Sequence, residues 1–170
     1  NGIIPSVGHT NALYSDMERI YNAGCRTATH MYSCMSSITR ENGMRRLGVI
    51  ESIYLLDGIT AEIIADGMHL PPELLRLIVK HLGADNLCLV SDSMRGAGMP
   101  DGESYLGRKD ECVPCIIEDG VAKLPDRSAF AGSVATSDRL VRTMVKKAGV
   151  SLCDAVKMIT ETPAKLLNAD

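Results

Sequence analysis

The chain has 170 residues, of which 45% are hydrophobic, and its formal net charge at pH 7 is -3. This length allows one domain with a buried core, and the weak negative charge argues against a nucleic-acid partner or a polybasic membrane surface. No apolar run approaches the roughly 20 residues of a membrane span, and no secretory signal is visible, so we expect neither nucleic acid nor membrane as a partner.

Short apolar runs in the first half of the chain predict four strands, each followed by a change to helical spacing. The predicted strands cover residues 3–9, 26–29, 61–65 and 87–90, with a further short extended piece at 47–50. Leu13, Met17 and Ile20 share one face of a helix that Thr10 or Asn11 can cap. A later helix begins at Pro71 and Pro72 and ends at Gly83.

The segment from about residue 94 to 130 is rich in Gly, Pro and charge and lacks helical periodicity. Asp119-Gly120 between two apolar runs predicts a β-hairpin there. Helical spacing then returns after Thr136 or Ser137, after Ser151, where Asp154 is placed for a capping box, and at Thr162-Pro163. Four βα units with a hairpin insertion indicate an α/β fold with a parallel sheet, either a small flavodoxin-like sheet or half of a (β/α)8 barrel.

Six cysteines are present, and only Cys112 and Cys115 form a CxxC motif. A redox CxxC normally begins a helix, whereas this one leads into the predicted hairpin. No second CxxC is available to complete a zinc site. We therefore favour structural thiols in a reducing, cytoplasmic setting over a redox or zinc role.

His9 and His30 end the first two predicted strands. Neighbouring parallel strands lie about 4.8 Å apart, so the two imidazoles can meet at one metal ion. Neutral imidazole suits zinc and other divalent transition metals. The alternative is that both are polar strand ends, hydrogen-bonded to nearby loops.

Two further residues at predicted strand ends can take part in acid–base chemistry. Asp92 follows the fourth strand, where it can move a proton at a metal-activated water or, alternatively, cap the next turn. His69, which follows Asp66 and precedes Pro71, can polarise a carbonyl or bind a substrate oxygen, or can simply mark the entry of a helix.

Anion binding has two weaker candidates. Arg40, Arg45 and Arg46 follow the second strand in a loop, and arginine suits bidentate phosphate contact, although solvated loop charge is the simpler interpretation of Arg45 and Arg46. Gly132-Ser133 lies before a capped helix and can present backbone N–H groups to an anion.

Taken together, the segments SVGHTNA, ATHMYSCM, RENG, IIADGMHL, LCLVSDSM and AGS, which span Ser6 to Ser133, resemble the N-acetylglucosamine-6-phosphate deacetylases of the amidohydrolase superfamily. The final TPAKLLNA is similar to the family's last barrel helix. The resemblance implies that residues 1–170 form one partial catalytic domain, strands five to eight of a metal-dependent (β/α)8 TIM barrel, with residues 94–130 as the insertion. It also implies that the N-terminal half-barrel and a small β domain are absent.

The resemblance implies roles for individual residues. His9 and His30 bind a divalent metal, with zinc favoured over iron or another metal; His69 contacts the acetamide carbonyl, and Asp92 is the general base and then the general acid. Ser33, Cys34 and Ser133 bind the substrate, and Arg40 contacts the phosphate in the neighbouring subunit of a homodimer. Ser33-Cys34 departs from the Asn and small residue usual in the family, and RENG lies one residue closer to the histidine.

The implied reaction is hydrolysis of N-acetylglucosamine 6-phosphate to glucosamine 6-phosphate and acetate in amino-sugar catabolism. The family's metal-binding glutamate lies on an earlier strand, and no segment of this chain matches it. Two alternatives stay open: another amidohydrolase, of the dihydroorotase or dipeptidase type, and a catalytically inactive fragment that acts only in assembly. An open strand edge in half a barrel would favour such pairing.

Overall fold

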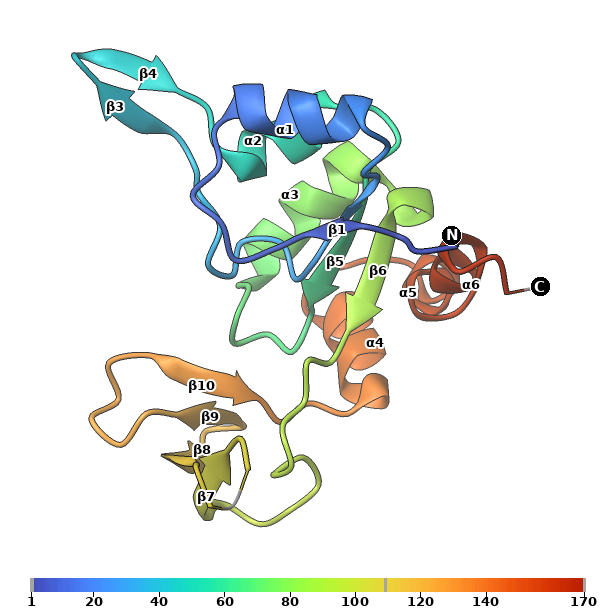
Figure 1. The fold of residues 1–170 in the computed structure, drawn as a ribbon. Coiled ribbons are helices and arrows are strands. Elements are labelled where there is room, and N and C mark those ends of the chain that lie inside the picture. The colour runs from blue at the N-terminus through green and yellow to red at the C-terminus, as the bar shows by residue number, and fades with distance from the viewer. Residues whose placement is uncertain (1, 109, 170) are drawn as a thin grey trace.

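A computed structural model describes residues 2–108 and 110–169 of the chain. Its centre is a four-stranded parallel sheet whose spatial order, β1-β2-β5-β6, follows the chain order (Figure 1). The strands are β1 (Ser6–Val7), β2 (Thr27–Ala28), β5 (Thr60–Ile64) and β6 (Leu87–Val90). All three strand pairs are parallel. The fold is therefore mixed α/β, and each of the four strands falls within or close to its predicted segment.

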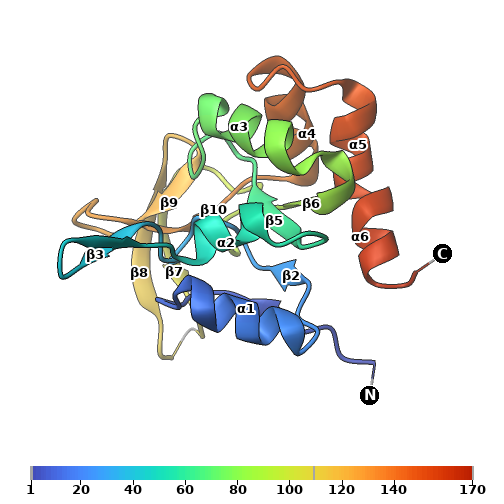
Figure 2. The same ribbon diagram turned by 90° about the horizontal axis from the view of Figure 1, so that it is seen from above.

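Helices follow each of the parallel strands. They are α1 (Tyr14–Asn22), α2 (Val49–Leu55), α3 (Pro72–Leu82), the 3-10 turn η1 (Ala84–Asn86), α4 (Ser137–Lys146), α5 (Leu152–Ile159) and α6 (Glu161–Leu166). Seen from above, α3 and α4 lie side by side next to β5 and β6 (Figure 2). None of the described helices is long and apolar enough to cross a membrane.

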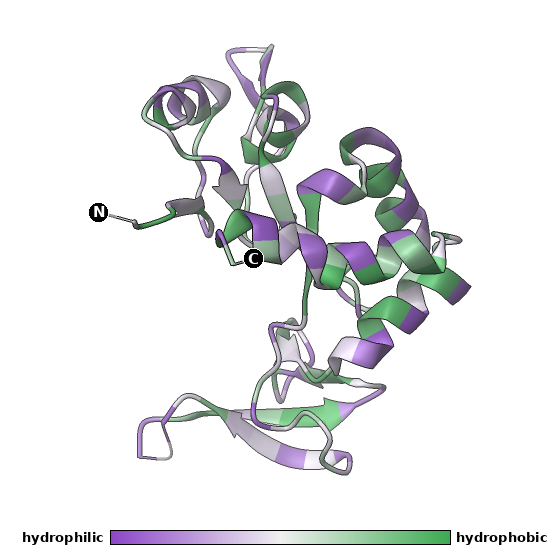
Figure 3. Ribbon diagram, turned by 90° about the vertical axis from the view of Figure 1, so that its right-hand side faces the viewer, coloured by the Kyte–Doolittle hydropathy of each residue, from purple (hydrophilic) through white to green (hydrophobic). Residues whose placement is uncertain are grey.

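The main hydrophobic core lies between the parallel sheet and its helices. Alternate residues of β5 and β6, such as Ile63 and Leu89, share one buried cluster with Leu75 of α3 and Met144 of α4. The helices accordingly carry apolar and polar residues on different faces (Figure 3). This alternation is the expected result of one strand face packing on helices.

Two helix boundaries follow the predicted local sequence signals, and a third does not. Gly83 ends α3 with a φ of 73°, a conformation that glycine adopts without steric cost. The Ser151 hydroxyl accepts a hydrogen bond from the Asp154 amide at 3.0 Å at the start of α5, as the capping pattern predicts. Helix α1 instead begins at Tyr14, where the Asp16 carboxylate accepts from the Leu13 amide at 3.1 Å. The prediction that Thr10 or Asn11 caps it was wrong.

The predicted extended piece at residues 47–50 was also wrong, because α2 begins at Val49. Two free N–H groups at its start find side-chain acceptors: Gly48 donates to Glu51 and Val49 donates to the Ser36 hydroxyl. Satisfying the first amides of a helix in this way favours helix over strand despite the β-branched residues. Just before it, β3 (Thr39–Glu41) and β4 (Met44–Arg46) form an exposed hairpin that projects from the body (Figure 1).

Residues 102–133 form a second sheet, antiparallel, of order β10-β9-β8-β7. Its strands are β7 (Gly102–Leu106), β8 (Val113–Glu118), β9 (Val121–Lys123) and β10 (Phe130–Ser133). Asp119 and Gly120, with φ values of 54° and 75°, join β8 to β9. The segment is thus a four-stranded sheet rather than the single hairpin expected from the sequence, because β7 and β10 carry too little apolar alternation to be recognised.

The antiparallel sheet has a small core of its own, in which Met94 packs with Cys115 and Ile117. It is attached to the parallel sheet directly after β6. Ser93 forms a parallel bridge with Ser133, and the Met94 amide donates to the Ser133 carbonyl at 2.9 Å. The end of β10 therefore continues the edge of the parallel sheet next to β6.

All six cysteines are free. Cys115 is buried on β8, with its sulfur 3.9 Å from that of Met94, whereas Cys112 is exposed just before the strand. Residues three apart in extended chain point to opposite faces, which disfavours a disulfide within CVPC. Burial, with a smaller effect from Glu62, raises the pKa of the Cys88 thiol to about 11.

Candidate functional site

His9 and His30 lie directly beyond neighbouring strands β1 and β2, and their side chains meet. The two Nε2 atoms are 3.0 Å apart, and both residues have positive φ, 43° and 29°. Gly8 permits this approach, because a Cβ at this position would lie 3.1 Å from the Cβ of Thr29. Strained backbone at two adjacent strand ends is typical of a functional site rather than of a simple turn.

The spacing of the two nitrogens fits a shared metal ion. Nitrogens bound about 2.0–2.1 Å from a tetrahedral zinc lie about 3.3 Å apart, close to the separation found here. His30 is only 9% exposed, and its Nδ1 has no hydrogen-bond partner among the described residues. A catalytic zinc usually has three protein ligands. Within residues 2–108 and 110–169, however, no group of three or more His, Cys, Asp or Glu residues is placed to bind a metal.

Asp92 joins the two histidines at one cavity. It follows β6 with a φ of 45°, and it lines a cavity of about 400 Å³ together with His9 and His30. The remaining lining comes from Ser93, Met94, Leu106, Ala131 and Gly132. The three residues predicted to converge at the carboxyl edge of the sheet therefore do lie together.

Asp66 and His69 form a second, self-contained pair after β5. The Asp66 carboxylate accepts from His69 Nδ1 at 2.7 Å and from the amides of Met68 and His69 at 2.8 and 2.9 Å. Burial opposes ionisation of Asp66, but these hydrogen bonds outweigh it and hold the pKa of the carboxyl below its ordinary value. The His69 ring is thereby oriented with Nδ1 occupied and Nε2 left for another partner.

Two residues distant in the sequence support this pair. Arg139 of α4 donates to the Asp66 carbonyl at 3.0 Å and to the Gly120 carbonyl at 2.7 Å. Phe130 of β10 packs against the His69 ring, with the ring centroids 5.1 Å apart. Because Phe130 directly precedes Ala131 and Gly132, His69 lies beside the wall of the cavity that Asp92 lines.

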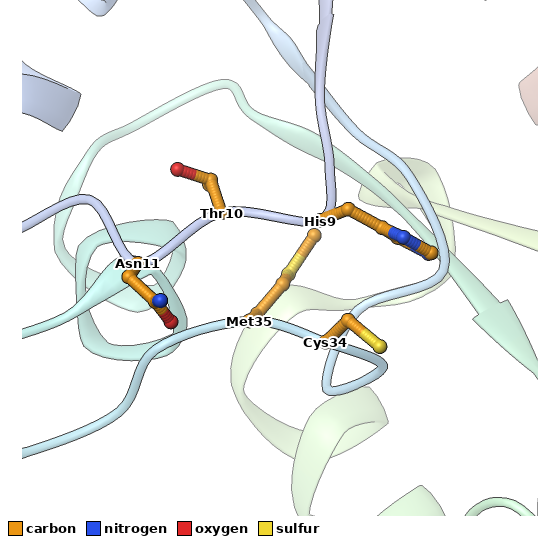
Figure 4. A pocket seen from close by; sticks show the side chains of 5 residues that line it. All are labelled: His9, Thr10, Asn11, Cys34 and Met35. Atoms are coloured by element: carbon orange, nitrogen blue, oxygen red, sulfur yellow. The ribbon is translucent and has the colours of Figure 1, made fainter.

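A second cavity, of about 370 Å³, also has His9 in its wall. Its other lining residues are Thr10, Asn11, Cys34 and Met35 (Figure 4). The Cys34 side chain points to the same side as the His9 imidazole, and Met35 reaches toward His9. The structure thus places the predicted substrate-binding residue Cys34 next to His9.

The other predicted binding residues lie farther from these cavities. Arg40 is exposed on the β3–β4 hairpin, and Ser33 is half-buried; neither lines either cavity. The Ser133 hydroxyl is buried and accepts from the Ala135 amide at 3.0 Å, so it turns inward while Gly132 faces the cavity. Helix α4 starts four positions later than Ser133, with Thr136 as its cap.

Sequence reasoning did not assign a site role to Asp66, Arg139 or Leu106. In an Asx turn, an aspartate side chain accepts hydrogen bonds from backbone amides two and three residues later in the chain. The spacing of Asp66 and His69 therefore did indicate that the two residues lie together. Arg139 and Leu106 had no local signal, because they reach the site only through packing of α4 and β7.

Comparisons with known proteins show the family of the chain. The family model described as "Amidohydrolase family" matches residues 2–170. An N-acetylglucosamine-6-phosphate deacetylase from Lysinibacillus sphaericus is 34% identical over 167 residues, which are 98% of this chain and 41% of that protein. An N-acetylgalactosamine-6-phosphate deacetylase from Escherichia coli O157:H7 is 30% identical, over 96% of this chain and 41% of that protein.

Solved structures show the same relationship. An N-acetylglucosamine-6-phosphate deacetylase from Thermotoga maritima superposes with a TM-score of 0.87 at 28% identity, covering 98% of this chain and 44% of its own. A mutant deacetylase from Mycobacterium smegmatis, in complex with N-acetyl-D-glucosamine-6-phosphate, gives 0.86 at 30% identity, covering 98% of this chain and 43% of its own. The chain spans about two fifths of the length of the curated relatives it matches. The chain belongs to the amidohydrolase family, and the resemblance to its N-acetylglucosamine-6-phosphate deacetylases is confirmed.

Proposed function

We propose that this chain is strands five to eight of a (β/α)8 barrel with the antiparallel sheet as an insertion. The complete protein would hydrolyse the acetamide of N-acetylglucosamine 6-phosphate to glucosamine 6-phosphate and acetate. The observation that carries the proposal is the convergence of His9, His30 and Asp92 on one cavity. The deacetylase relatives and the bound amino-sugar phosphate in one of them support the choice of substrate.

His9 and His30 are the residues of this chain that would hold a divalent metal, with zinc as the proposed ion. Amidohydrolases are generally metal-dependent, and the 3.0 Å separation of the two Nε2 atoms supports their role as ligands. A bound divalent metal lowers the pKa of water and polarises a carbonyl. The third protein ligand, a glutamate, would come from outside residues 1–170.

Asp92 is the proposed proton carrier. It takes a proton from the attacking water and then delivers it to the departing amine nitrogen. His69 binds the carbonyl oxygen through Nε2, the nitrogen that Asp66 leaves free. A fixed donor aimed at the developing oxyanion is usually the largest electrostatic contribution to such catalysis.

The cavity beside Cys34 lies at the start of the loop that continues to Arg40, so we assign the sugar phosphate to this side of His9. Cys34, Ser33 and, from the neighbouring subunit of a homodimer, Arg40 are the proposed contacts. The projecting position of the β3–β4 hairpin supports an arginine that serves a second subunit. We also propose Ser133, through its backbone, as a substrate contact and the cytoplasm as the compartment.

The test is acetate release by the complete protein, with and without prior chelation of its metal. We expect activity on N-acetylglucosamine 6-phosphate, loss on chelation and recovery on addition of zinc. N-acetylglucosamine without phosphate should be a poor substrate, whereas a dihydroorotase-like or dipeptidase-like enzyme would have no need of the phosphate. Activity that survives complete metal removal would contradict the proposal.

The 4-epimer, N-acetylgalactosamine 6-phosphate, is the matched second substrate, because a relative with that activity is 30% identical to the chain. We expect the gluco substrate to be preferred. If the galacto substrate is preferred instead, the proposed deacetylation stands, but the proposed sugar changes to N-acetylgalactosamine 6-phosphate.

A further inference from the structure

The two cavities that share His9 differ in the side chains opposite it. The loop cavity, defined by Thr10, Asn11 and Cys34, is lined largely by short polar residues. The sheet cavity, defined by Met94, Leu106 and Ala131, has an apolar wall formed by these side chains. His9 and the neighbouring His30 therefore lie where a polar and an apolar compartment meet.

We propose that the sheet cavity receives the acyl group of the substrate and that Leu106 determines which acyl chain length is accepted. This inference rests on the proposed deacetylase function. The two substituents of an amide leave its carbonyl in different directions. If the carbonyl lies at His9 and His30 and the sugar phosphate enters the loop cavity, the acyl carbons point toward the apolar wall, where burying them is favourable.

The wall is held in a fixed position relative to Asp92. The Met94 amide donates to the Ser133 carbonyl, and the Met94 side chain, 9% exposed, packs in the small core with Cys115. Gly132 lies against this methionine, since a Cβ there would be 3.7 Å from the Met94 Cβ. A wall anchored on both sides can discriminate by size, because it does not retreat when a longer group enters.

Leu106 is the member of the wall best suited to set the chain length. It is the last residue of β7, opposite Val113 on β8, and 40% of it is exposed. Its side chain is therefore outside the packed core formed by Met94, Cys115 and Ile117, so its replacement leaves that core intact. Met94, in contrast, cannot be changed without disturbing the sheet.

The experiment compares Leu106→Ala with the unchanged complete protein, both loaded with zinc, on N-acetyl-, N-propionyl- and N-butyrylglucosamine 6-phosphate. The quantity measured is the ratio of kcat/KM for the butyryl substrate to that for the acetyl substrate. One methylene in an apolar pocket changes kcat/KM by about 10–200-fold, so we expect the ratio to rise at least about tenfold in Leu106→Ala. Leu77→Ala is the matched control, because Leu77 is 46% exposed and lies on α3, outside the cavity.

A second variant, Leu106→Phe, should shift the ratio in the opposite direction by narrowing the cavity. An unchanged ratio in both Leu106 variants, with acetyl hydrolysis retained, would overturn the acyl-pocket inference and leave the deacetylase function standing. The same holds for an equal fall on every acyl substrate. If the unchanged protein hydrolyses none of the three, the proposed function fails, and the inference fails with it.

Discussion

Two pairs of side chains lie at the edge of the parallel sheet, Asp66 with His69 and His9 with His30. They differ in how many of their polar atoms have hydrogen-bond partners. In the Asp66–His69 pair, the carboxylate accepts three hydrogen bonds, one of them from the ring. In the His9–His30 pair, the two Nε2 atoms face each other at 3.0 Å, and the buried Nδ1 of His30 has no partner among the described residues. Among the described residues, the first pair therefore has partners for its buried polar atoms, whereas the second leaves one without a partner.

The difference indicates distinct tasks. A ring fixed by a carboxylate is prepared to bind one ligand atom in one direction. Two imidazoles whose Nε2 atoms face each other at this distance can share a proton, with one nitrogen donating to the other, or can both direct their lone pairs to a cation between them. The comparison therefore supports the proposal that His9 and His30 bind the metal and that His69 binds the substrate, and it can be tested one side chain at a time.

Replacing His30 with alanine should have the largest effect. Loss of one of the two imidazole ligands should remove the metal. Without the several kcal/mol by which a metal stabilises charge in the transition state, kcat/KM should fall about 10⁴-fold. The metal content of the purified complete protein checks the loss of metal, and the rate of acetate release checks the loss of activity. Full metal occupancy in His30→Ala would remove the basis for assigning the pair to a cation.

Asp92→Asn should reduce kcat by about 10²–10⁴-fold, the usual contribution of general acid–base catalysis, while metal content stays unchanged. Asparagine keeps the size of the side chain but accepts no proton. The measurement is kcat for acetate release together with metal content. A loss smaller than about tenfold would argue that Asp92 only caps its turn.

Asp66→Asn should have an intermediate effect, about 10–100-fold on kcat/KM, as expected when the partner that orients a functional histidine is removed. An asparagine that keeps the two backbone hydrogen bonds presents an N–H group to His69 Nδ1, so the charge-assisted bond to the carboxylate is replaced by a weaker one in which Nδ1 can only accept. Metal content should not change. If it falls together with activity, the two pairs are not independent, and the comparison is wrong.

The same substitution should change the pH dependence of stability. Because the pKa of folded Asp66 lies below its ordinary value of 3.8, its charged form stabilises the fold above that pH. The contribution is lost as pH falls through the lower, folded value. We expect Asp66→Asn to lower the free energy of unfolding by about 1–3 kcal/mol at pH 7, with a difference that shrinks below about pH 4. Urea unfolding at pH 7, 5 and 3 measures it, and a constant difference would contradict the charge-based account.

His81→Ala should have the smallest effect and serves as the matched control for His30→Ala. His81 is exposed near the end of α3 and touches the Tyr54 ring edge-on, with the ring centroids 6.0 Å apart. Metal content and activity should be unchanged, and the free energy of unfolding should fall by less than about 1 kcal/mol, the scale of one exposed aromatic contact. Loss of metal from this variant would show that the metal assay responds to damage unrelated to the site.

Much of the fold could be predicted because its strands and helices have strong local signals. The β6 strand at Leu87–Val90 and the α3 helix between Pro72 and Gly83 are examples, since apolar runs, proline and glycine act over a few residues. The α2 helix was missed although Glu51, three residues after Gly48, is a local capping signal; its other acceptor, the Ser36 hydroxyl, reaches Val49 only when the chain has folded. The extent of the antiparallel sheet was missed because β7 and β10 carry little apolar alternation and find their partner strands only on folding.

The candidate site divides in the same way. The convergence of its candidate residues could be predicted because His9, His30 and Asp92 each follow a strand, and parallel strands bring their carboxyl ends to one edge. Their partners could not be identified so directly. Arg139 reaches the Asp66 carbonyl from 73 positions away, and Leu106 reaches the cavity only through the docking of the antiparallel sheet.

The sequence by itself determined which residue types stand at the ends of the parallel strands, because the order and polarity of βα units are local and repetitive. Only the tertiary structure decided that two imidazole nitrogens lie 3.0 Å apart, that Asp66 occupies one side of His69, and that an apolar wall faces Asp92. Those relationships depend on left-handed backbone at the strand ends and on the docking of the second sheet. Both arise from packing between segments that are far apart in the chain.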